Sequence, residues 1–229
     1  MVMLSFIAKA IEPVEQTNIY LLPGQGADER LFKNLEFSEK YCVNHIEYVT
    51  PTYETSLKEY AQTLAQQIDE SSPFILIGVS LGGMLATEMT DFMEPEKTII
   101  LASAKNTSEL PRTFNFQKKV PLYKLVGKRN VKWGAKVLKP IVEPDFRKEK
   151  EIYKAMLEDK DPDFLLRTIP MIMTWDRTAH NENIIHIHGT KDHTIPYKNV
   201  KCDYPIEGGS HMMTLTQSDK INKVLETIL

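Results

Sequence analysis

Short apolar runs alternate with helix-like segments along most of this chain. The apolar runs span residues 17–23, 41–50, 73–79, 98–104, 183–188 and 201–206, and the run at 73–79 (PFILIGV) is the most hydrophobic. Apolar residues at helical spacing cover residues 55–70, 80–92 and 219–229. Continuous apolar runs are typical of strands buried on both faces, and strands that alternate with helices form parallel sheets. The pattern predicts an α/β fold with a mostly parallel central sheet flanked by helices.

Residues 105–180 interrupt this alternation. The segment carries no strand-like run, is rich in charged residues, and contains both tryptophans of the chain, Trp133 and Trp175. We expect several helices here, inserted as a cap between two strands of a core that comprises residues 1–104 and 181–229. The cap would act as a lid over a ligand pocket, because inserted segments at a ligand edge often gate access. The alternative is a set of helices that only covers the sheet.

The composition restricts the partners and the location of the protein. The 229 residues suit one α/β domain, and 28 basic against 31 acidic residues give a net charge of −3. This balance shows no basic excess that would indicate nucleic acid or an anionic membrane as a partner. No stretch approaches the roughly 20 apolar residues of a membrane span. The apolar run at the N-terminus is too short for a secretory signal, so we expect a cytoplasmic protein. No sequence feature indicates the oligomeric state.

The two cysteines, Cys42 and Cys202, lie far apart in the sequence. Each falls within an apolar run, and a free cysteine usually behaves as a small buried hydrophobic residue. Nothing else indicates an oxidising compartment. We therefore expect two free cysteines that are buried in strands.

The pattern G-x-S-x-G occurs at residues 78–82 (GVSLG), between an apolar run and a helix-like segment. In this context Ser80 sits on a tight strand-to-helix turn, where the flanking glycines let neighbouring backbones approach. The turn presents the hydroxyl at a helix N-terminus, whose dipole favours negative charge. We therefore predict that Ser80 is a nucleophile; the alternative is a glycine-rich turn with a capping serine. A phosphate-binding loop is excluded, because the G-K-[ST] pattern is missing.

A serine hydroxyl needs a neighbouring base to remove its proton, and the base needs a carboxylate to hold its tautomer. His211 lies in the GGSH segment at 208–211, between the last apolar run and the last helix, and is the predicted base. Asp192 ends the HGTKD segment at 188–192, just beyond the preceding run, and is the predicted acid. The alternatives are an exposed loop histidine and an ordinary turn aspartate, with Asp203 as the rival acid.

The histidines near this acid allow a second interpretation. His186, His188, Asp192 and His193 could be ligands of a metal ion. His186 and His188 alternate along a strand and point to one face, whereas the other two residues lie beyond its end. One coordination sphere would be difficult to assemble from them. We expect no metal site, and we expect His186 and His188 to be packing residues.

Acyl transfer builds negative charge on a carbonyl oxygen, which preorganised N–H donors stabilise. One donor is expected to be the amide of Leu81, which follows the predicted nucleophile. The second is expected to be the amide of Gln25, in the glycine-rich loop PGQGAD at 23–28 that follows the first strong strand. The alternative is that Gly24 and Gly26 only make a turn.

Together these segments resemble the α/β-hydrolase superfamily: PGQG, GVSLGG, HGTKD and GGSH follow one another in the family's order. Members usually carry His-Gly in the first loop, where this chain has Pro23 before the glycine. The resemblance implies the α/β-hydrolase fold and hydrolysis through an acyl-enzyme, in which Ser80 attacks, His211 transfers the proton and Asp192 orients His211. It implies neither a metal nor an organic cofactor. The family's leading antiparallel strands would be reduced to residues 2–10.

The resemblance favours small carboxylic esters or thioesters as substrates, in the manner of a carboxylesterase. Lyases and C–C hydrolases of the family use the same three residues, and some members are non-catalytic ligand-binding proteins, so these alternatives remain open. The substrate pocket is expected to draw on the first loop, the cap and the loop beyond the predicted acid, with Gly24, Met171, Trp175 and His193 as lining residues.

Overall fold

The computed structural model describes residues 16–114, 127 and 146–229. Their centre is a six-stranded sheet in the order β2-β1-β3-β4-β5-β6, and every neighbouring pair is parallel. The predicted α/β fold with a parallel central sheet is confirmed. The strands are β1 (Thr17–Leu22), β2 (Tyr41–His45), β3 (Phe74–Val79), β4 (Lys97–Leu101), β5 (Ile184–Gly189) and β6 (Tyr204–Ile206).

The strand order changes direction between β1 and β3. β2 pairs with one edge of β1, whereas β3 pairs with its other edge and each later strand adds beyond β3. β3 is buried along its whole length. The chain thus leaves β1 and β3 toward opposite sides, which opens a crevice at the carboxyl ends of the strands. In open α/β sheets, ligands bind at such a crevice.

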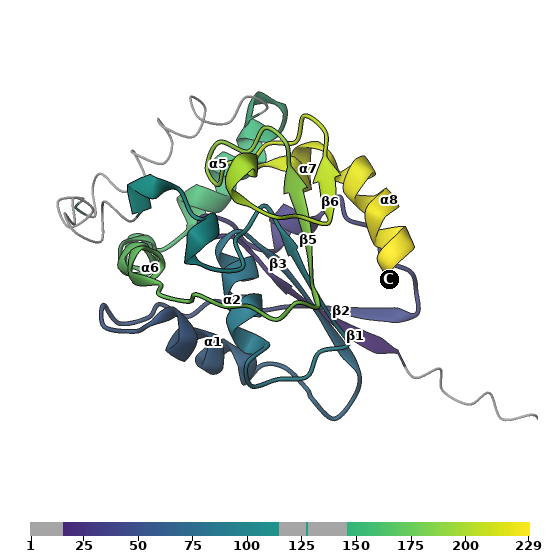
Figure 1. Cartoon of the computed structure of the whole chain (residues 1–229), viewed down its shortest axis with the longest axis horizontal. Coiled ribbons are helices and arrows are strands. Elements are labelled where there is room, and N and C mark those ends of the chain that lie inside the picture. Colours follow the sequence, from purple (N-terminus) through teal and green to yellow (C-terminus); the bar gives the residue numbers. More distant parts are fainter. Residues whose placement is uncertain (1–15, 115–126, 128–145) are drawn as a thin grey trace, which may run out of the picture.

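Helices cover both faces of this sheet (Figure 1). α1 (Leu57–Ala65) and α2 (Leu81–Met89) pack together on one face, and α8 (Ser218–Ile228) lies on the other. A capping box of Ser56 and Glu59 begins α1, satisfying two backbone N–H groups at its start. Three shorter helices occur in the connections: η1 (Glu29–Phe32), η5 (Tyr197–Asn199) and α7 (Met213–Thr216).

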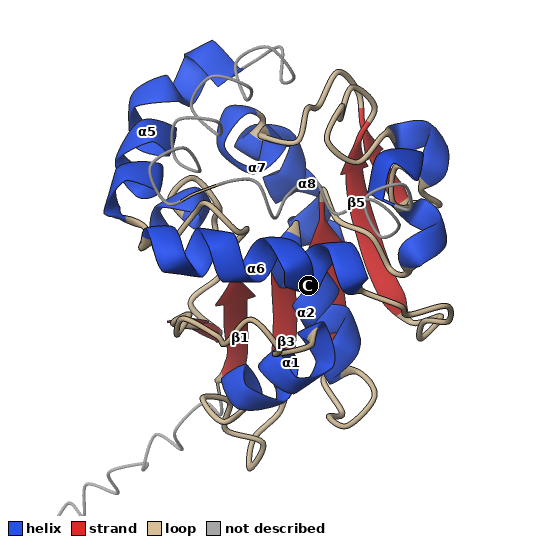
Figure 2. Ribbon diagram, turned by 90° about the vertical axis from the view of Figure 1, so that its left-hand side faces the viewer, coloured by secondary structure: helices blue, strands red, loops and turns tan. Residues whose placement is uncertain are grey.

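The described part of the insertion between β4 and β5 contains helices and no strand. They are η2 (Thr107–Glu109), η4 (Phe146–Glu149), α5 (Lys150–Asp159) and α6 (Pro162–Thr174). Figure 2 shows α6 crossing near the carboxyl ends of β1 and β3. Trp133 and the predicted N-terminal strand at 2–10 lie outside the described residues. No helix in the described part of the chain is long and apolar enough to cross a membrane.

Several strands are shorter than their apolar runs predict. β2 ends at His45 rather than at residue 50, and β6 begins only at Tyr204. β4 ends at Leu101, because Ala102 has a φ of 45° and leaves the extended region. Apolar residues continue beyond the ends of β2 and β4, so hydrophobicity alone places these two boundaries too late.

The expected burial of the cysteines is wrong. Cys42 is exposed, because it lies on β2, the edge strand of the sheet, most of whose side chains face solvent. Cys202 is half-buried in the loop before β6 rather than within the strand. Both are free, as expected.

The tight packing of α2 on β1 gives a first prediction. A Cβ on Gly82 would overlap the carbonyl oxygen of Leu22 and lie 2.7 Å from that of Pro23. Gly82→Ala should therefore lower the free energy of unfolding by about 3 kcal/mol or more, measured by urea denaturation. Gly26→Ala is the matched control, since its Cβ would meet its nearest neighbour, a Leu157 methyl, at an ordinary 3.6 Å. Equal stability of the two variants would contradict the packing argument.

Candidate active site

Ser80 occupies the tight turn between β3 and α2. Its backbone angles, φ 54° and ψ −117°, are costly for a residue with a side chain, and such strain persists only where the surroundings enforce it. Glycines make the turn possible: a Cβ on Gly78 would overlap the carbonyl of Gly82, and one on Gly83 would lie 2.5 Å from the side chain of Ser103. The turn lifts the Ser80 hydroxyl above the carboxyl end of the sheet, at the start of α2.

The neighbouring strand β4 holds the turn from one side. The amide of Ser80 donates to the carbonyl of Leu101 at 3.0 Å, and the Ser103 hydroxyl donates to the carbonyl of Ser80 at 2.7 Å. Ser103 is fully buried, and Ala102, which precedes it in the sequence, has a left-handed φ of 45°. Two successive turns after β3 and β4 thus support each other. Ser103 could not be predicted from the sequence, because an isolated serine at a strand end carries no specific signal.

The structure brings Ser80, His211 and Asp192 into one hydrogen-bonded series. Nε2 of His211 lies 2.9 Å from Oγ of Ser80, and Nδ1 lies 2.8 Å from Oδ2 of Asp192. An ionised carboxylate only accepts, so Nδ1 carries the proton and Nε2 is free to accept from the serine hydroxyl. His211 and Asp192 are both buried, on loops that follow β6 and β5. The series can transfer a proton away from Ser80 and stabilise the resulting imidazolium.

The Asp192 carboxylate is held on both oxygens. Oδ1 accepts from the amide of Ile195 at 2.8 Å, while Oδ2 faces His211 and, at 3.5 Å, Nε2 of His188. Burial raises the pKa of Asp192, but the charge of His211 and the hydrogen bonds it receives outweigh this effect, so its pKa lies below the ordinary value. Asp192 therefore stays ionised. The rival acid, Asp203, instead accepts from the backbone amide of His186 at 2.8 Å.

Behind the acid lies a buried pair of histidines. Nε2 of His188 donates to the carbonyl of Ile195 at 2.9 Å, so its Nδ1 accepts from Nε2 of His186 at 3.0 Å. Burial, the neighbouring His188 and nearby Lys105 hold the pKa of His186 well below its ordinary value, and burial lowers that of His188. Both rings are fully buried. Within the described residues no group of three or more metal-ligating side chains could hold an ion.

The loop after β1 faces Ser80 from the other side of the crevice. A Cβ on Gly24 would be in van der Waals contact with Cβ of Ser80, at 3.4 Å, which shows how closely this loop approaches the turn. No described residue accepts a hydrogen bond from the backbone amide of Gln25 or Leu81. A donor to an oxyanion must have its N–H free in this way.

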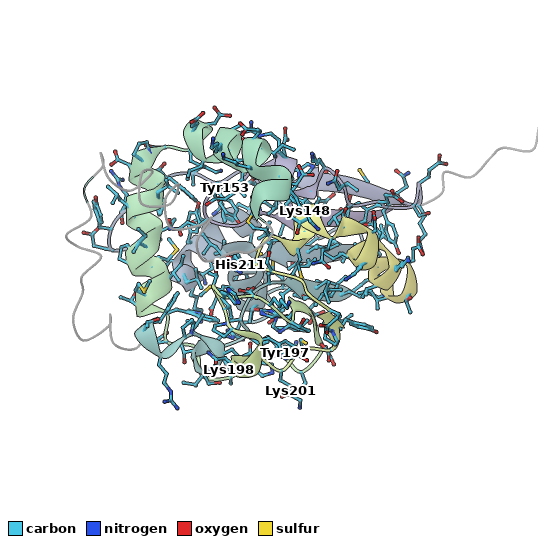
Figure 3. The ribbon with its side chains drawn as sticks, turned by 90° about the horizontal axis from the view of Figure 1, so that it is seen from above. Lys148, Tyr153, Tyr197, Lys198, Lys201 and His211 are labelled. Atoms are coloured by element: carbon cyan, nitrogen blue, oxygen red, sulfur yellow. The ribbon has the colours of Figure 1, made fainter. Side chains whose placement is uncertain are left out.

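A cavity of about 180 Å³ opens beside the Ser80 hydroxyl. Core and cap both line it: Tyr153 comes from α5, and His211 from the loop after β6 (Figure 3). Its described lining is mostly apolar and carries no aspartate, glutamate, lysine or arginine: Gly24, Gln25, Gly26, Ala27, Leu31, Val79, Ser80, Tyr153, Met156, Leu157, Leu165, Thr194, His211 and Met212. The site can therefore accept a small, uncharged group next to the serine.

Three of the expected pocket residues lie elsewhere. Met171 and Trp175 line a separate cleft at the end of α6, where the Trp175 indole donates to the buried carboxylate of Glu88 at 2.8 Å. A buried indole N–H needs a hydrogen-bond partner, and Trp175 finds it in Glu88 of α2. The ring therefore points toward α2 rather than toward Ser80. His193 is exposed, and its neighbour Thr194 lines the cavity instead. Of the four predicted lining residues, Gly24 is at the cavity.

Comparisons with known proteins were made on sequence and on structure. A model of the alpha/beta hydrolase family matches residues 15–224. No curated protein sequence matches the chain significantly. The enol-lactonase from Burkholderia xenovorans LB400 superposes with a TM-score of 0.71 at 14% identity, covering 93% of this chain and 90% of the other. An esterase from Thermogutta terrifontis gives 0.70 at 14% identity, with 93% and 89% covered. An esterase from Exiguobacterium antarcticum gives 0.68 at 14% identity, with 93% and 92% covered.

The buried histidine pair predicts a loss of stability in mild acid. His186 and His188 stay neutral in the fold but bind protons in the unfolded chain below their ordinary pKa of 6.5. The unfolded state then binds more protons, so stability is complete above pH 6.5 and falls below it, by up to about 1.4 kcal/mol per pH unit for each histidine. Urea unfolding from about one pH unit above the ordinary pKa to about one and a half units below it should show a shallower decline for His186→Gln. Equal slopes for wild type and variant would refute this assignment.

Proposed function

Because the chain belongs to the alpha/beta hydrolase family, we propose that it is a serine hydrolase that cleaves small carboxylic esters or thioesters. One observation carries the proposal: Oγ of Ser80 lies 2.9 Å from Nε2 of His211, whose Nδ1 lies 2.8 Å from Asp192. These distances match what a nucleophile, its base and an orienting carboxylate require. The esterases and the lactonase of the same fold act on bonds of this kind and so agree with the proposal.

In the first half of the reaction, Oγ of Ser80 attacks the carbonyl carbon of the ester while Nε2 of His211 takes its proton. The carbonyl oxygen becomes an oxyanion, which the amides of Gln25 and Leu81 stabilise. Asp192 holds the positive imidazolium through Nδ1. The C–O bond to the alcohol then breaks, Nε2 gives its proton to the leaving oxygen, and the acyl group remains on Ser80.

In the second half, a water molecule replaces the alcohol. Nε2 of His211 takes a proton from the water as its oxygen attacks the acyl carbon, and the same amides hold the second oxyanion. The bond to Oγ breaks, Ser80 recovers its proton from His211, and the carboxylic acid leaves. No redox step and no further reactant are required.

The cavity supports a short, apolar acyl group. Its volume of about 180 Å³ corresponds to roughly six water molecules at about 30 Å³ each. The helices of the cap contribute Met156 and Leu157 of α5 and Leu165 of α6 to its lining, all apolar and buried. An ionised acyl group would lose its hydration there without gaining a charged partner among the described lining residues.

Loss of the nucleophile tests the proposal. Ser80→Ala should lower the hydrolysis of p-nitrophenyl acetate or butyrate by about 10⁴-fold or more, and should abolish labelling by a fluorophosphonate probe. Ser38→Ala, on an exposed surface position, is the matched control and should leave both readouts unchanged. Wild type that labels at Ser80 but hydrolyses no ester would favour the lyase or C–C hydrolase chemistry. Wild type that neither labels nor hydrolyses would favour a ligand-binding protein.

The size of the cavity predicts the preferred chain length. Wild type should cleave p-nitrophenyl butyrate with a higher kcat/KM than the octanoate, because the longer chain exceeds the enclosed space. Met156→Ala removes a fully buried side chain from the lining, so it should shift the preference toward the longer ester by about tenfold. The ratio of the two kcat/KM values is the measurement. A ratio unchanged by Met156→Ala would contradict the assignment of this cavity as the acyl pocket.

A further inference from the structure

The side chain of Gln25 reaches across the crevice to the cap. Its Nε2 donates two hydrogen bonds to α6, one to the hydroxyl of Thr168 at 2.8 Å and one to the carbonyl of Leu165 at 3.2 Å. The backbone amide of the same residue is the donor assigned above to the oxyanion. One residue therefore joins the loop after β1 to a helix that lies more than 140 positions later in the sequence.

The hydrogen-bond pattern fixes the orientation of this contact. The carbonyl of Leu165 can only accept, so the group that faces it must be the amide NH₂ of Gln25. The Thr168 hydroxyl already donates to the carbonyl of Phe164 at 2.8 Å, which leaves an oxygen lone pair for the second N–H of Gln25. Thr168 is fully buried. Both hydrogens of the Gln25 amide therefore have partners, and breaking the contact would cost two hydrogen bonds.

α6 is itself fastened to the core near both of its ends. At its start, the Thr50 hydroxyl donates to the N-cap Asp161 at 3.0 Å. At its end, Trp175 donates to the buried Glu88 of α2 at 2.8 Å. Between them, the guanidinium of Arg167 donates to the carbonyl of Pro51 at 3.0 Å. The helix is a fixed wall against which the Gln25 side chain can be held.

We propose that Gln25 is a positioning residue whose side chain ties the oxyanion loop to α6, so that the cap helix sets the place of the backbone donor at Ser80. The inference rests on the proposed function and deepens it. The loop is rich in glycine (PGQG, residues 23–26), so its backbone conformation depends on contacts. The Tyr48 hydroxyl donates to the carbonyl of Pro23 and the Ala27 amide donates to that of Gly24, and the Gln25 side chain adds the contact with α6. The anchor restricts the loop before substrate arrives, as a preorganised donor requires.

Removal of the anchor should reduce kcat and leave substrate binding largely intact. Gln25→Met keeps the length of the side chain but loses both N–H groups, and should lower kcat by about 10- to 100-fold with KM changed less than about threefold. Thr168→Val removes one of the two acceptors, so its kcat should fall between those of wild type and Gln25→Met. The double variant should be no slower than Gln25→Met alone, because both changes break the same contact.

Two further variants of α6 separate positioning from general damage to the helix. Thr168→Ser keeps the hydroxyl and should restore kcat to near the wild-type value. Thr174→Val removes a hydroxyl that makes the same kind of bond to the preceding turn, to the carbonyl of Pro170 at 2.8 Å, but lies at the exposed end of α6. It should leave kcat unchanged. The affinity for a trifluoromethyl ketone, whose adduct with Ser80 carries an oxyanion, should fall in Gln25→Met by the same factor as kcat.

The outcomes distinguish this inference from the proposed function. An active wild type with an unchanged kcat in a folded Gln25→Met overturns the anchor alone, and so does a loss confined to KM. A fall in kcat that the trifluoromethyl ketone affinity does not follow also overturns it, because the oxyanion site would then be intact. A wild type that neither hydrolyses esters nor labels at Ser80 overturns the proposed function, and the anchor with it.

Discussion

The contact on which the rest of the site depends is the close approach of the β3–α2 turn to the end of β1. Gly82 packs against the carbonyls of Leu22 and Pro23 with no room for a side chain. This approach keeps Ser80 in its strained conformation and at the same time brings the glycine-rich loop after β1 to within van der Waals contact of it. The nucleophile and the candidate oxyanion donors thus come from the two strands between which the sheet changes direction.

A buried negative charge is the main electrostatic cost of this arrangement. Asp192 is fully enclosed, and an isolated carboxylate in that position would be strongly destabilising. The structure offsets the cost with the amide of Ile195, the ring of His211 and the nearby N–H of His188. His186 extends this polar series into the core, where it stays neutral. The pair of histidines is therefore more than apolar packing, because its N–H groups are hydrogen-bonded, that of His186 to His188 and that of His188 to the carbonyl of Ile195.

The sequence was most informative for residues whose type is required by the chemistry and whose position is determined by the backbone. The G-x-S-x-G pattern predicts Ser80, and the loops just beyond the last two strands predict Asp192 and His211; the structure brings the three within hydrogen-bond distance. The pocket was less predictable: Trp175 was expected beside the serine, but its indole N–H is satisfied by Glu88 on the other side of α6. Which way a buried side chain points depends on tertiary partners, and these are distant in the sequence.

The contacts of α6 change what the cap can do in catalysis. A lid that swings open must give up its contacts with the core, and α6 would lose polar contacts through Asp161, Arg167 and Trp175. A typical intramolecular hydrogen bond contributes about 0.5–1.5 kcal/mol. It would also release Gln25, and with it the loop that carries the proposed oxyanion donor. These contacts favour α6 as a fixed part of the site over α6 as a moving lid. Changes in α6 that alter the acyl pocket through Leu165 should therefore also reach the reacting oxygen, because selectivity and catalytic rate depend on the same helix.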